Sequence, residues 1–278
     1  MQIRTPAVAG MFYPKTQQEL KSSIKDCFLH KFGPGKLFPT SDNKKIIGVI
    51  CPHAGYMYSG PVAANSYYAI SSLKPDLVII IGPNHWGIGC NIATMKEGVW
   101  ETPLGKLEVD GSAALDIHKM SSVVELDFLS HTRDHSLEVQ LPMLQEIYSH
   151  GFKILPIILI DQSYKSSKEL GMAIANISKN KKIVIIGSSD FTHYEENEYA
   201  YKQDKSLIEP ILRMDIDGFY RILQENQVSA CGYGAIASTM TACKELGATK
   251  GELVKYATSG DIAGDKSSVV GYASIIFS

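Results

Sequence analysis

Three short runs of β-branched and aliphatic residues, without polar alternation, stand out along the chain at residues 45–51, 77–82 and 183–187. Continuous apolar runs of this length are typical of strands buried on both faces, and such strands belong to parallel sheets covered by helices. Each run ends in a loop rich in Pro, Gly or Ser, and a histidine follows within a few residues: His53, His85 and His193. Because ligands bind beyond the carboxyl ends of such strands, the pattern predicts that three imidazoles meet at one edge of the sheet.

The segments between these runs predict helices and further strands. Thr16 and Glu19 form a capping-box pattern that opens a helix to about His30, and Ser136 is expected to cap a helix that begins at Leu137. Further helices are predicted over residues 62–70, 112–120, 166–178, 196–224 with an interruption near Asp215, and 235–246. Further strands are predicted over residues 152–160, 251–258 and 268–277, with a loop at 259–266 between the last two.

This order of elements predicts the α/β class. Strands and helices alternate, so the fold is expected to have three layers, with helices on both faces of a mostly parallel central sheet. No Pro/Ser-rich linker, low-complexity tract or repeat divides residues 1–278, which predicts a single domain.

The composition excludes several classes of protein. Hydrophobic residues make up 45% and charged residues 20%, which is ordinary for a soluble globular protein. The net charge of −2 gives no electrostatic basis for binding nucleic acid or an anionic membrane. Five cysteines without a CxxC motif argue against a disulfide framework or a zinc ribbon, and no signal peptide or apolar run of about 18 residues occurs. We therefore expect a cytoplasmic protein.

The histidines at the strand ends are the first candidates for chemistry. His53 lies between Pro52 and the small residues that follow it, and His85 repeats this arrangement after Gly-Pro-Asn. Either one alone could be a loop histidine that pairs with a carbonyl, but the repetition favours a site. His193 follows Asp190, where a carboxylate or a hydroxyl could orient the imidazole as a general base.

Two further histidines, His131 and His135, have the i, i+4 spacing of helical metal sites. Both precede the predicted helix, so His131 is interpreted as part of a solvated loop. His135 is a stronger candidate because Glu138, on the first turn of that helix, could pair with it or face a site at the edge of the sheet. The remaining histidines lie near predicted helix ends and are interpreted as structural: His30, His118 and His150.

Cys231 differs from the other cysteines, which lie in strand-like or helical surroundings typical of small buried hydrophobes. It precedes Gly232 and Gly234 at the start of a predicted helix, where backbone N–H groups are expected to lower a thiol pKa. A thiolate there could bind iron, copper or zinc, or act as a nucleophile.

Eight segments of the chain, in order, resemble the Memo family, and the resemblance covers essentially the whole sequence. They are Arg4-Thr-Pro-Ala-Val-Ala-Gly-Met-Phe-Tyr-Pro14, Pro52-His-Ala-Gly-Tyr-Met-Tyr-Ser-Gly60, Gly82-Pro-Asn-His85, Thr102-Pro-Leu-Gly105, Asp134-His-Ser-Leu-Glu-Val-Gln-Leu-Pro142, Ser188-Ser-Asp-Phe-Thr-His193, Cys231-Gly232 and Val270-Gly-Tyr-Ala273. The family is similar in fold to the class III extradiol dioxygenases, with a cysteine in place of the carboxylate ligand of their non-haem iron pocket.

The resemblance implies roles for individual residues. His53, His85 and Cys231 would bind the metal, which would be iron or copper, with zinc as a further option. His193 would take the place of the dioxygenase acid/base histidine, and Asp190 and His135 would line the pocket.

Three functions follow from these candidates. The first is a metal-dependent oxidoreductase of dioxygenase type on an unknown substrate. The second is a binding module that uses the inherited pocket for a peptide, a small ligand or a protein partner without turnover. The third is a metal-free cysteine hydrolase in which Cys231 works with His193 or His135, oriented by Asp190 or Glu138. The hydrolase would leave two histidines at the same edge without a role, which favours the first two. The oligomeric state is left open.

Overall fold

The computed structural model describes residues 2–37, 45–179 and 181–278. Its centre is a nine-stranded sheet with the order β10-β12-β2-β9-β3-β8-β4-β7, in which β11 also pairs with β12. The bounds are β2 (Gly48–Cys51), β3 (Leu77–Pro83), β4 (Ile92–Thr94), β7 (Glu125–Leu126), β8 (Lys153–Leu159), β9 (Ile183–Ser188), β10 (His193–Glu195), β11 (Gly251–Thr258) and β12 (Val269–Phe277). The four central strands, β2, β9, β3 and β8, are parallel, whereas β12 and β4 join them on either side as antiparallel neighbours.

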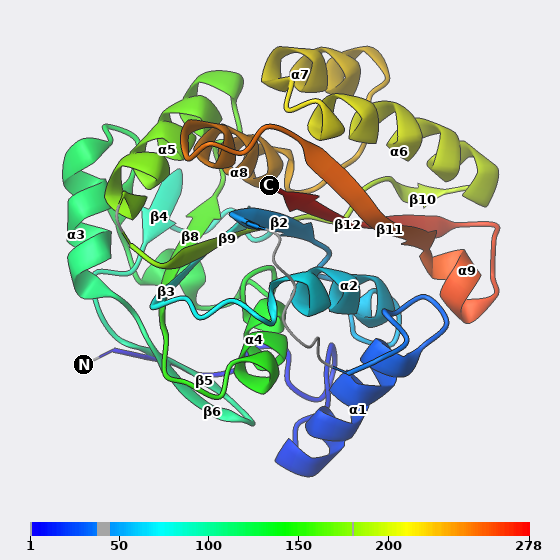
Figure 1. Ribbon diagram of the computed structural model, residues 1–278, viewed down its shortest axis with the longest axis horizontal. Coiled ribbons are helices and arrows are strands. Elements are labelled where there is room, and N and C mark those ends of the chain that lie inside the picture. The colour runs from blue at the N-terminus through cyan, green and yellow to red at the C-terminus, as the bar shows by residue number, and fades with distance from the viewer. Residues whose placement is uncertain (1, 38–44, 180) are drawn as a thin grey trace.

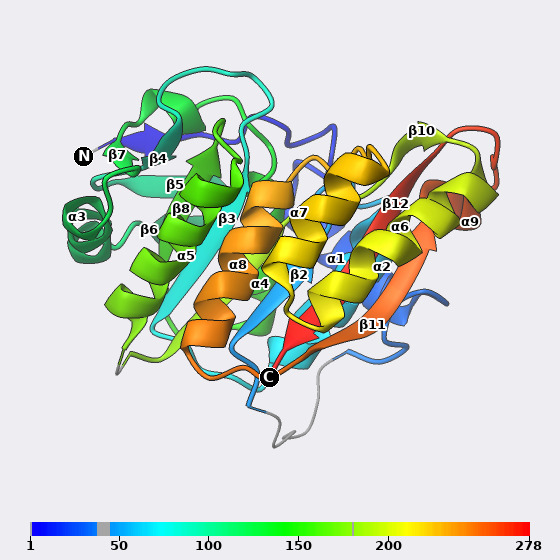
Figure 2. The ribbon, with the colours of Figure 1, turned by 90° about the horizontal axis from the view of Figure 1, so that it is seen from above.

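Helices cover both faces of this sheet, as predicted for the α/β class (Figure 1). One face carries α5 (Tyr164–Ser178), α6 (Asn197–Leu212), α7 (Ile216–Glu225) and α8 (Tyr233–Glu245), which lie side by side in Figure 2. The other face carries α1 (Gln17–Leu29), α2 (Gly60–Ile70) and α4 (Leu141–Ile147). Helix α3 (Gly111–Met120) lies at the edge near β7 (Figure 2). A small sheet of β1 (Ile3–Arg4), β5 (Val99–Thr102) and β6 (Gly105–Glu108) packs below α4.

Alternate side chains of the buried strands pack against the helices on opposite faces of the sheet. In β3, Ile79 and Ile81 pack into the core beneath α5 and α8, whereas Val78 and Ile80 pack into the core beneath α1, α2 and α4. Side chains on successive strand residues point to opposite faces, so a strand buried on both faces must be apolar throughout. This is why the three runs show no polar alternation.

Predictions of helix starts and interruptions were confirmed where they depend only on neighbouring residues. Thr16 caps α1 by accepting a hydrogen bond from the N–H of Glu19, and the helical stretch 196–224 is interrupted after Leu212, with Asp215 capping α7. The predicted Ser136 cap is wrong. Its hydroxyl donates to the carbonyl of Pro83, 2.8 Å away, and the chain continues through a short 3₁₀ turn, η2 (Glu138–Gln140), before α4 begins.

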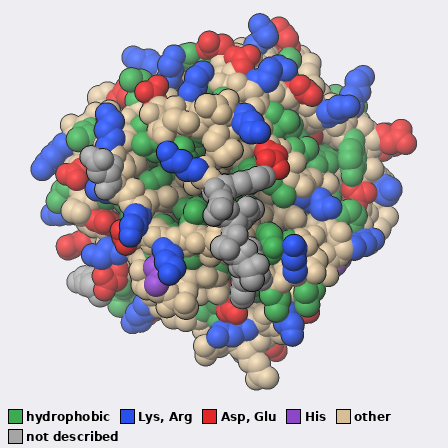
Figure 3. Space-filling view, in the orientation of Figure 1, with side chains coloured by type: hydrophobic (Ala, Val, Ile, Leu, Met, Phe, Trp, Pro, Cys, Tyr) green, Lys and Arg blue, Asp and Glu red, His purple; other side chains and the backbone are tan. Residues whose placement is uncertain are grey.

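Two further features complete the fold. The loop predicted at 259–266 contains a short helix, α9 (Ser259–Ala263), which begins with a capping box between Thr258 and Asp261. No helix among the described residues is long and apolar enough to cross a membrane. On the face shown in Figure 3, acidic and basic side chains are interspersed, consistent with the small net charge.

Candidate metal centre

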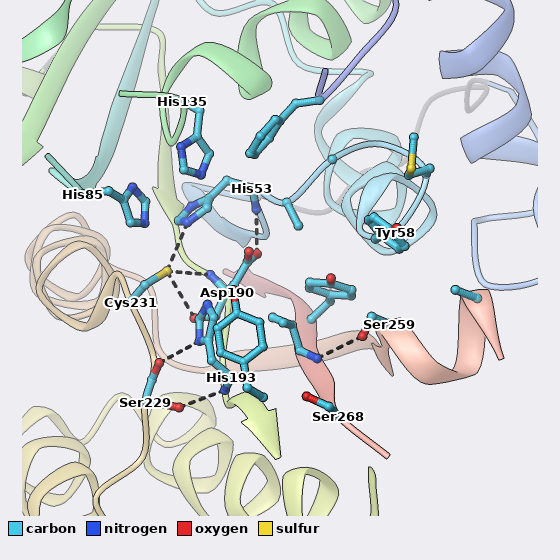
Figure 4. Close-up of a pocket in the computed structure, with 18 of the residues that line it drawn as sticks. His53, Tyr58, His85, His135, Asp190, His193, Ser229, Cys231, Ser259 and Ser268 are labelled. Atoms are coloured by element: carbon cyan, nitrogen blue, oxygen red, sulfur yellow. Dashed lines mark hydrogen bonds between the residues drawn. The ribbon is translucent and has the colours of Figure 1, made fainter. Parts of the chain in front are cut away.

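The topology brings the predicted histidines to one edge of the sheet. Strands β2, β9 and β3 are parallel neighbours, and Cys51 pairs with Ser188 at the carboxyl ends of the first two. The loops that follow place the rings of His53 and His85 with centroids 5.2 Å apart. His193 lies at the start of β10 and lines the same cavity, which has a volume of about 850 Å³ (Figure 4). The prediction that the three imidazoles meet at one edge is therefore confirmed.

A third imidazole lies closer to His53 and His85 than His193 does. One ring nitrogen of His53, of His85 and of His135 lie within 4.8 Å of one another. The rings of His85 and His135 are stacked with centroids 4.5 Å apart, and His53 meets both of them edge-on. The family resemblance placed His135 in the lining of the pocket rather than among the ligands, whereas the structure adds it to a group with the spacing of metal ligands.

Hydrogen bonds fix the tautomer of His53. Its Nδ1 lies 2.8 Å from Ser188 Oγ, which also contacts the Ser136 carbonyl at 2.7 Å and the Gln140 amide nitrogen at 2.9 Å. The single hydroxyl proton goes to the carbonyl, so Nδ1 of His53 must donate to Ser188 and Nε2 keeps a free lone pair. Burial, followed by the charges of neighbouring histidines, lowers the pKa of His53 well below its usual value. The ring is a neutral base with Nε2 directed at the cavity.

His85 is held in the same way by Asp134. Its Nδ1 lies 3.0 Å from Oδ2 of Asp134, and its backbone N–H donates to the same oxygen at 2.6 Å. Burial would raise the pKa of Asp134, but hydrogen bonds from His85 and Ser136 outweigh it and hold the pKa below its usual range. The interpretation of His131 as part of a solvated loop is wrong, because His131 is fully buried and the neighbouring Asp134 side chain is only 2% exposed.

Cys231 lies beside His53, with 3.1 Å between its Sγ and Nε2 of that ring. Two donors bound to one ion are roughly 3.1–3.6 Å apart, given metal–sulfur and metal–nitrogen distances near 2.3 and 2.1 Å. The expected lowering of the thiol pKa by the helix is wrong, because burial, joined by the Asp190 carboxylate, raises the pKa of Cys231 well above its usual value. Without a metal the thiol keeps its proton and donates a hydrogen bond to Nε2 of His53. A bound cation would displace that proton, so the donor chemistry fits a thiophilic metal.

Asp190 and His193 are oriented by different groups. Oδ1 of Asp190 accepts the backbone N–H of His53 at 2.8 Å, and burial raises the pKa of this carboxyl to about 6. His193 instead uses Ser229, whose carbonyl accepts from Nδ1 at 2.9 Å and whose hydroxyl accepts the His193 N–H at 2.8 Å. The orienting partner of His193 is thus a carbonyl rather than Asp190, and Nε2 is left as the basic nitrogen.

The predicted pairing of His135 with Glu138 is also wrong. The carboxylate of Glu138 is fully buried and is bound by Arg4, by the hydroxyl of Tyr13 and by the backbone N–H groups of residues 7 and 8. These contacts fix the N-terminal segment against the site, so that the ring of Phe12 lies 4.5 Å from that of His135.

Several residues of the site escaped sequence reasoning. Ser188 and Gln140 hold His53, and tyrosines from three separate segments form part of the cavity wall: Tyr58, Tyr194 and Tyr272. The run of hydroxyl residues before Asp190 was the available signal for Ser188. Nothing in the spacing of the tyrosines indicates that they share one wall.

The protein is of the α/β class and has a candidate metal centre at the carboxyl edge of its sheet. This centre contains two imidazoles with unprotonated Nε2 atoms, a third imidazole and a neighbouring thiol. Comparison with known proteins identifies the family. A family model described as "Memo-like protein" matches residues 4–276, and the chain belongs to this family. The predicted resemblance is therefore confirmed.

Individual relatives agree with that assignment. A "MEMO1 family protein" of Nitrosopumilus maritimus is 60% identical over 275 residues, covering 99% of both chains. Another from Methanopyrus kandleri is 45% identical over 278 residues, covering 99% of this chain and 98% of its own. Among solved structures, that of an uncharacterized protein from Escherichia coli K12 aligns with a TM-score of 0.56 at 10% identity, covering 84% of this chain and 100% of its own. This last likeness concerns the fold alone.

Proposed function

We propose that this Memo-like protein binds a redox-active metal ion, iron or copper, through His53, His85 and Cys231, and acts as an oxidoreductase on a small molecule held in the cavity. The observation that carries the proposal is the pair of fixed tautomers. Ser188 and Asp134 each accept a hydrogen bond from an Nδ1–H group, which leaves Nε2 of two neighbouring histidines unprotonated as a ligand.

Cys231 is a better third ligand than His135 because of its contacts. Its sulfur is 3.1 Å from the ligand nitrogen of His53 and accepts the backbone N–H of Asp190 at 3.3 Å, so its position is set. His135 makes only ring contacts, stacked on His85, tilted against Phe12 and edge-on to His53, and no described residue hydrogen-bonds its ring. Thiolate with imidazole selects copper, iron or zinc over hard cations.

The remaining site residues have roles that need no further group. A metal ion in this site would supply redox and Lewis-acid chemistry. His193, with Nδ1 committed to a carbonyl, can take a proton from a bound substrate at Nε2. Burial, with His85 next, lowers the pKa of His135 to about 4, so this ring is a neutral hydrogen-bond acceptor at pH 7. Asp190 holds the loop that carries His53.

The alternative function is a binding module that holds a ligand without turnover. It is favoured by the wide mouth of the cavity, where Met11, Met57 and Tyr194 are exposed. Substrate-dependent oxygen uptake that disappears in His193→Gln would exclude this alternative.

The cysteine hydrolase is disfavoured, because the thiol contacts His53 rather than His193 and the pKa of the thiol is raised. Five free cysteines and a thiol ligand suit a reducing cytoplasm.

Anaerobic titration of the metal-free protein with Fe(II) or Cu(I) tests the proposed ligands. Cys231→Ala is expected to weaken binding by at least about 100-fold, whereas His135→Ala weakens it by less than about tenfold. Cys90→Ala is the matched control, since Cys90 is a partly exposed cysteine outside the site, and it should leave the affinity unchanged. Unchanged affinity in Cys231→Ala together with a large loss in His135→Ala would replace the proposed site with a three-imidazole site.

A further inference from the structure

The wall of the cavity beyond the candidate ligands is rich in tyrosine. Tyr58 precedes α2, Tyr194 lies in β10 and Tyr272 lies in β12, and all three line the cavity. Burial, with the Asp190 carboxylate next, raises the pKa of Tyr272, and the phenols of Tyr58 and Tyr194 are close enough to raise it further. All three tyrosines line the same cavity, Tyr58 and Tyr194 with exposed rings and Tyr272 with a buried one. Figure 4 shows Tyr58 on the side opposite His85.

Within the described part of the chain, the cavity lining carries acidic side chains without basic ones of the lysine or arginine type. It contains two carboxylates, Asp190 and Asp265, but no lysine or arginine among the described residues. Lys266, next along the chain, faces Asp261 at 3.9 Å instead. A divalent ion held by a thiolate would still leave the carboxylates and thiolate in excess by one negative charge. A carboxylate or phosphate ligand would be repelled by this negative charge, and no described lysine or arginine in the lining would pair with it.

One of the three tyrosines is held in a strained backbone conformation. Tyr194 has φ of 61°, in the left-handed region that non-glycine residues rarely adopt, and its side chain is 77% exposed. An exposed aromatic ring in such a conformation contributes little to packing. Strained residues of this kind cluster at ligand clamps, where the surrounding structure holds them for binding.

We propose that the cavity selects an organic cation, an amine with an apolar or aromatic body, which binds against the exposed rings of Tyr58 and Tyr194, beside the buried Tyr272 and near Asp265. Aromatic faces attract ammonium groups, and the attraction is strongest where water is excluded. Met11 and Met57, at the mouth, supply adaptable apolar contact for the body of the molecule. This inference rests on the proposed function only in taking the cavity as the substrate site, and it does not require the metal.

Binding to the metal-free protein tests the selection, using three molecules of matched size: phenethylamine, 2-phenylethanol and phenylacetate. Isothermal titration, supported by ligand-observed NMR, is expected to show the amine binding about tenfold more tightly than the alcohol, and the carboxylate binding more weakly still. Tyr194→Leu should remove most of the preference for the amine, whereas Tyr194→Phe, which keeps the aromatic face, should retain it.

Charge variants separate a local site from general attraction to an acidic protein. Asp265→Asn should reduce amine binding several-fold, whereas Glu97→Asn, which removes an exposed acid outside the cavity, should have no effect. Equal or tighter binding of the carboxylate, or an amine preference that survives Tyr194→Leu, would overturn the inference. Because no metal is added, either outcome is independent of whether Cys231 binds a metal.

Discussion

His131 and His135 are four residues apart, yet they lie in opposite environments. His131 is fully buried with Arg4, Asp134 and Glu138, a set that we term the buried polar network, and its ring meets that of Trp100 edge-on. His135 faces the open cavity beside His85. In the network, Arg4 and Glu138 are bound by several hydrogen bonds each, whereas in the cavity the described residues leave Nε2 of His85 and of His193 without a hydrogen-bond partner.

The difference shows how one segment supports both stability and function. Asp134 joins the two regions, because its carbonyl accepts from Arg4 at 2.6 Å while its carboxylate holds His85. The buried polar network fixes the backbone of residues 131–138. This backbone in turn positions His135 and the Asp134 carboxylate at the cavity. Substitutions in the network should therefore change stability most, and substitutions facing the cavity should change binding most.

The largest effect is expected from Arg4→Met. Arg4 donates to the carbonyls of His131 and Asp134, pairs with Glu138 and stacks over Trp100 at 4.5 Å. Its removal leaves a buried carboxylate without its counterion, which lowers the free energy of unfolding by about 3–5 kcal/mol. Urea unfolding followed by circular dichroism measures this change.

Lys106→Met is the control for Arg4→Met, because Lys106 forms an exposed ion pair with Glu101 and should change stability by less than about 0.5 kcal/mol. A loss in Arg4→Met as small as in this control would mean that the N–H groups and the Tyr13 hydroxyl satisfy Glu138 by themselves.

The second prediction concerns Asp134→Asn, which keeps the size of the side chain but removes the charge that holds His85. Metal affinity is expected to fall by about 10–100-fold, as for other partners that orient a ligand histidine. Asp110→Asn is a matched control, since Asp110 caps α3 away from the cavity. Anaerobic metal titration of both variants should show a loss only in the first, and equal affinities would remove Asp134 from the metal site.

The features of these two regions that depend on local sequence patterns could be predicted from the sequence. The three apolar runs placed β2, β3 and β9 and their histidines, because strands buried on both faces have a distinctive composition. The sequence could not show that Arg4 meets Glu138, since a contact across 134 residues leaves no local signal. Ser136 was misread as a helix cap for the same reason: its partner is a carbonyl in another segment. The sequence favoured His135 over His131, but it placed His131 in a solvated loop, and only the fold shows that His131 is fully buried.

Acid pH distinguishes the two regions further. Burial, joined by the charge of Arg4, lowers the pKa of His131 to about 3, and neither ring nitrogen has a partner in hydrogen-bonding geometry among the described residues. An unfolded histidine takes up a proton near pH 6.5, so between this pH and about 3 the unfolded chain binds more protons. His131 therefore makes the free energy of unfolding fall as the pH falls, by up to about 1.4 kcal/mol per pH unit.

His131→Leu should remove this contribution and leave metal affinity unchanged. Asp190 and Asp204, whose pKa values burial raises to about 6, act in the opposite direction between their usual pKa and 6, and they are common to both proteins. Urea unfolding at pH 7, 5 and 4 would show a shallower acid decline in the variant. Identical slopes would contradict the assignment of a neutral, buried His131.

The smallest effect is expected at the rim of the cavity, in Tyr194→Gly. Glycine adopts the left-handed conformation without steric cost. Because the exposed Tyr194 ring adds little packing, relief of the backbone strain should raise the free energy of unfolding by roughly 0.5–1 kcal/mol. Gln227, with φ of 49°, offers a matched control outside the cavity lining. Gln227→Gly should gain stability by a similar amount and keep the binding of phenethylamine, whereas Tyr194→Gly should gain stability and lose that binding. If Tyr194→Gly lost stability instead, the ring would be part of the packing rather than held in strain for a ligand, and the contrast between the buried polar network and the cavity rim would no longer apply to this residue.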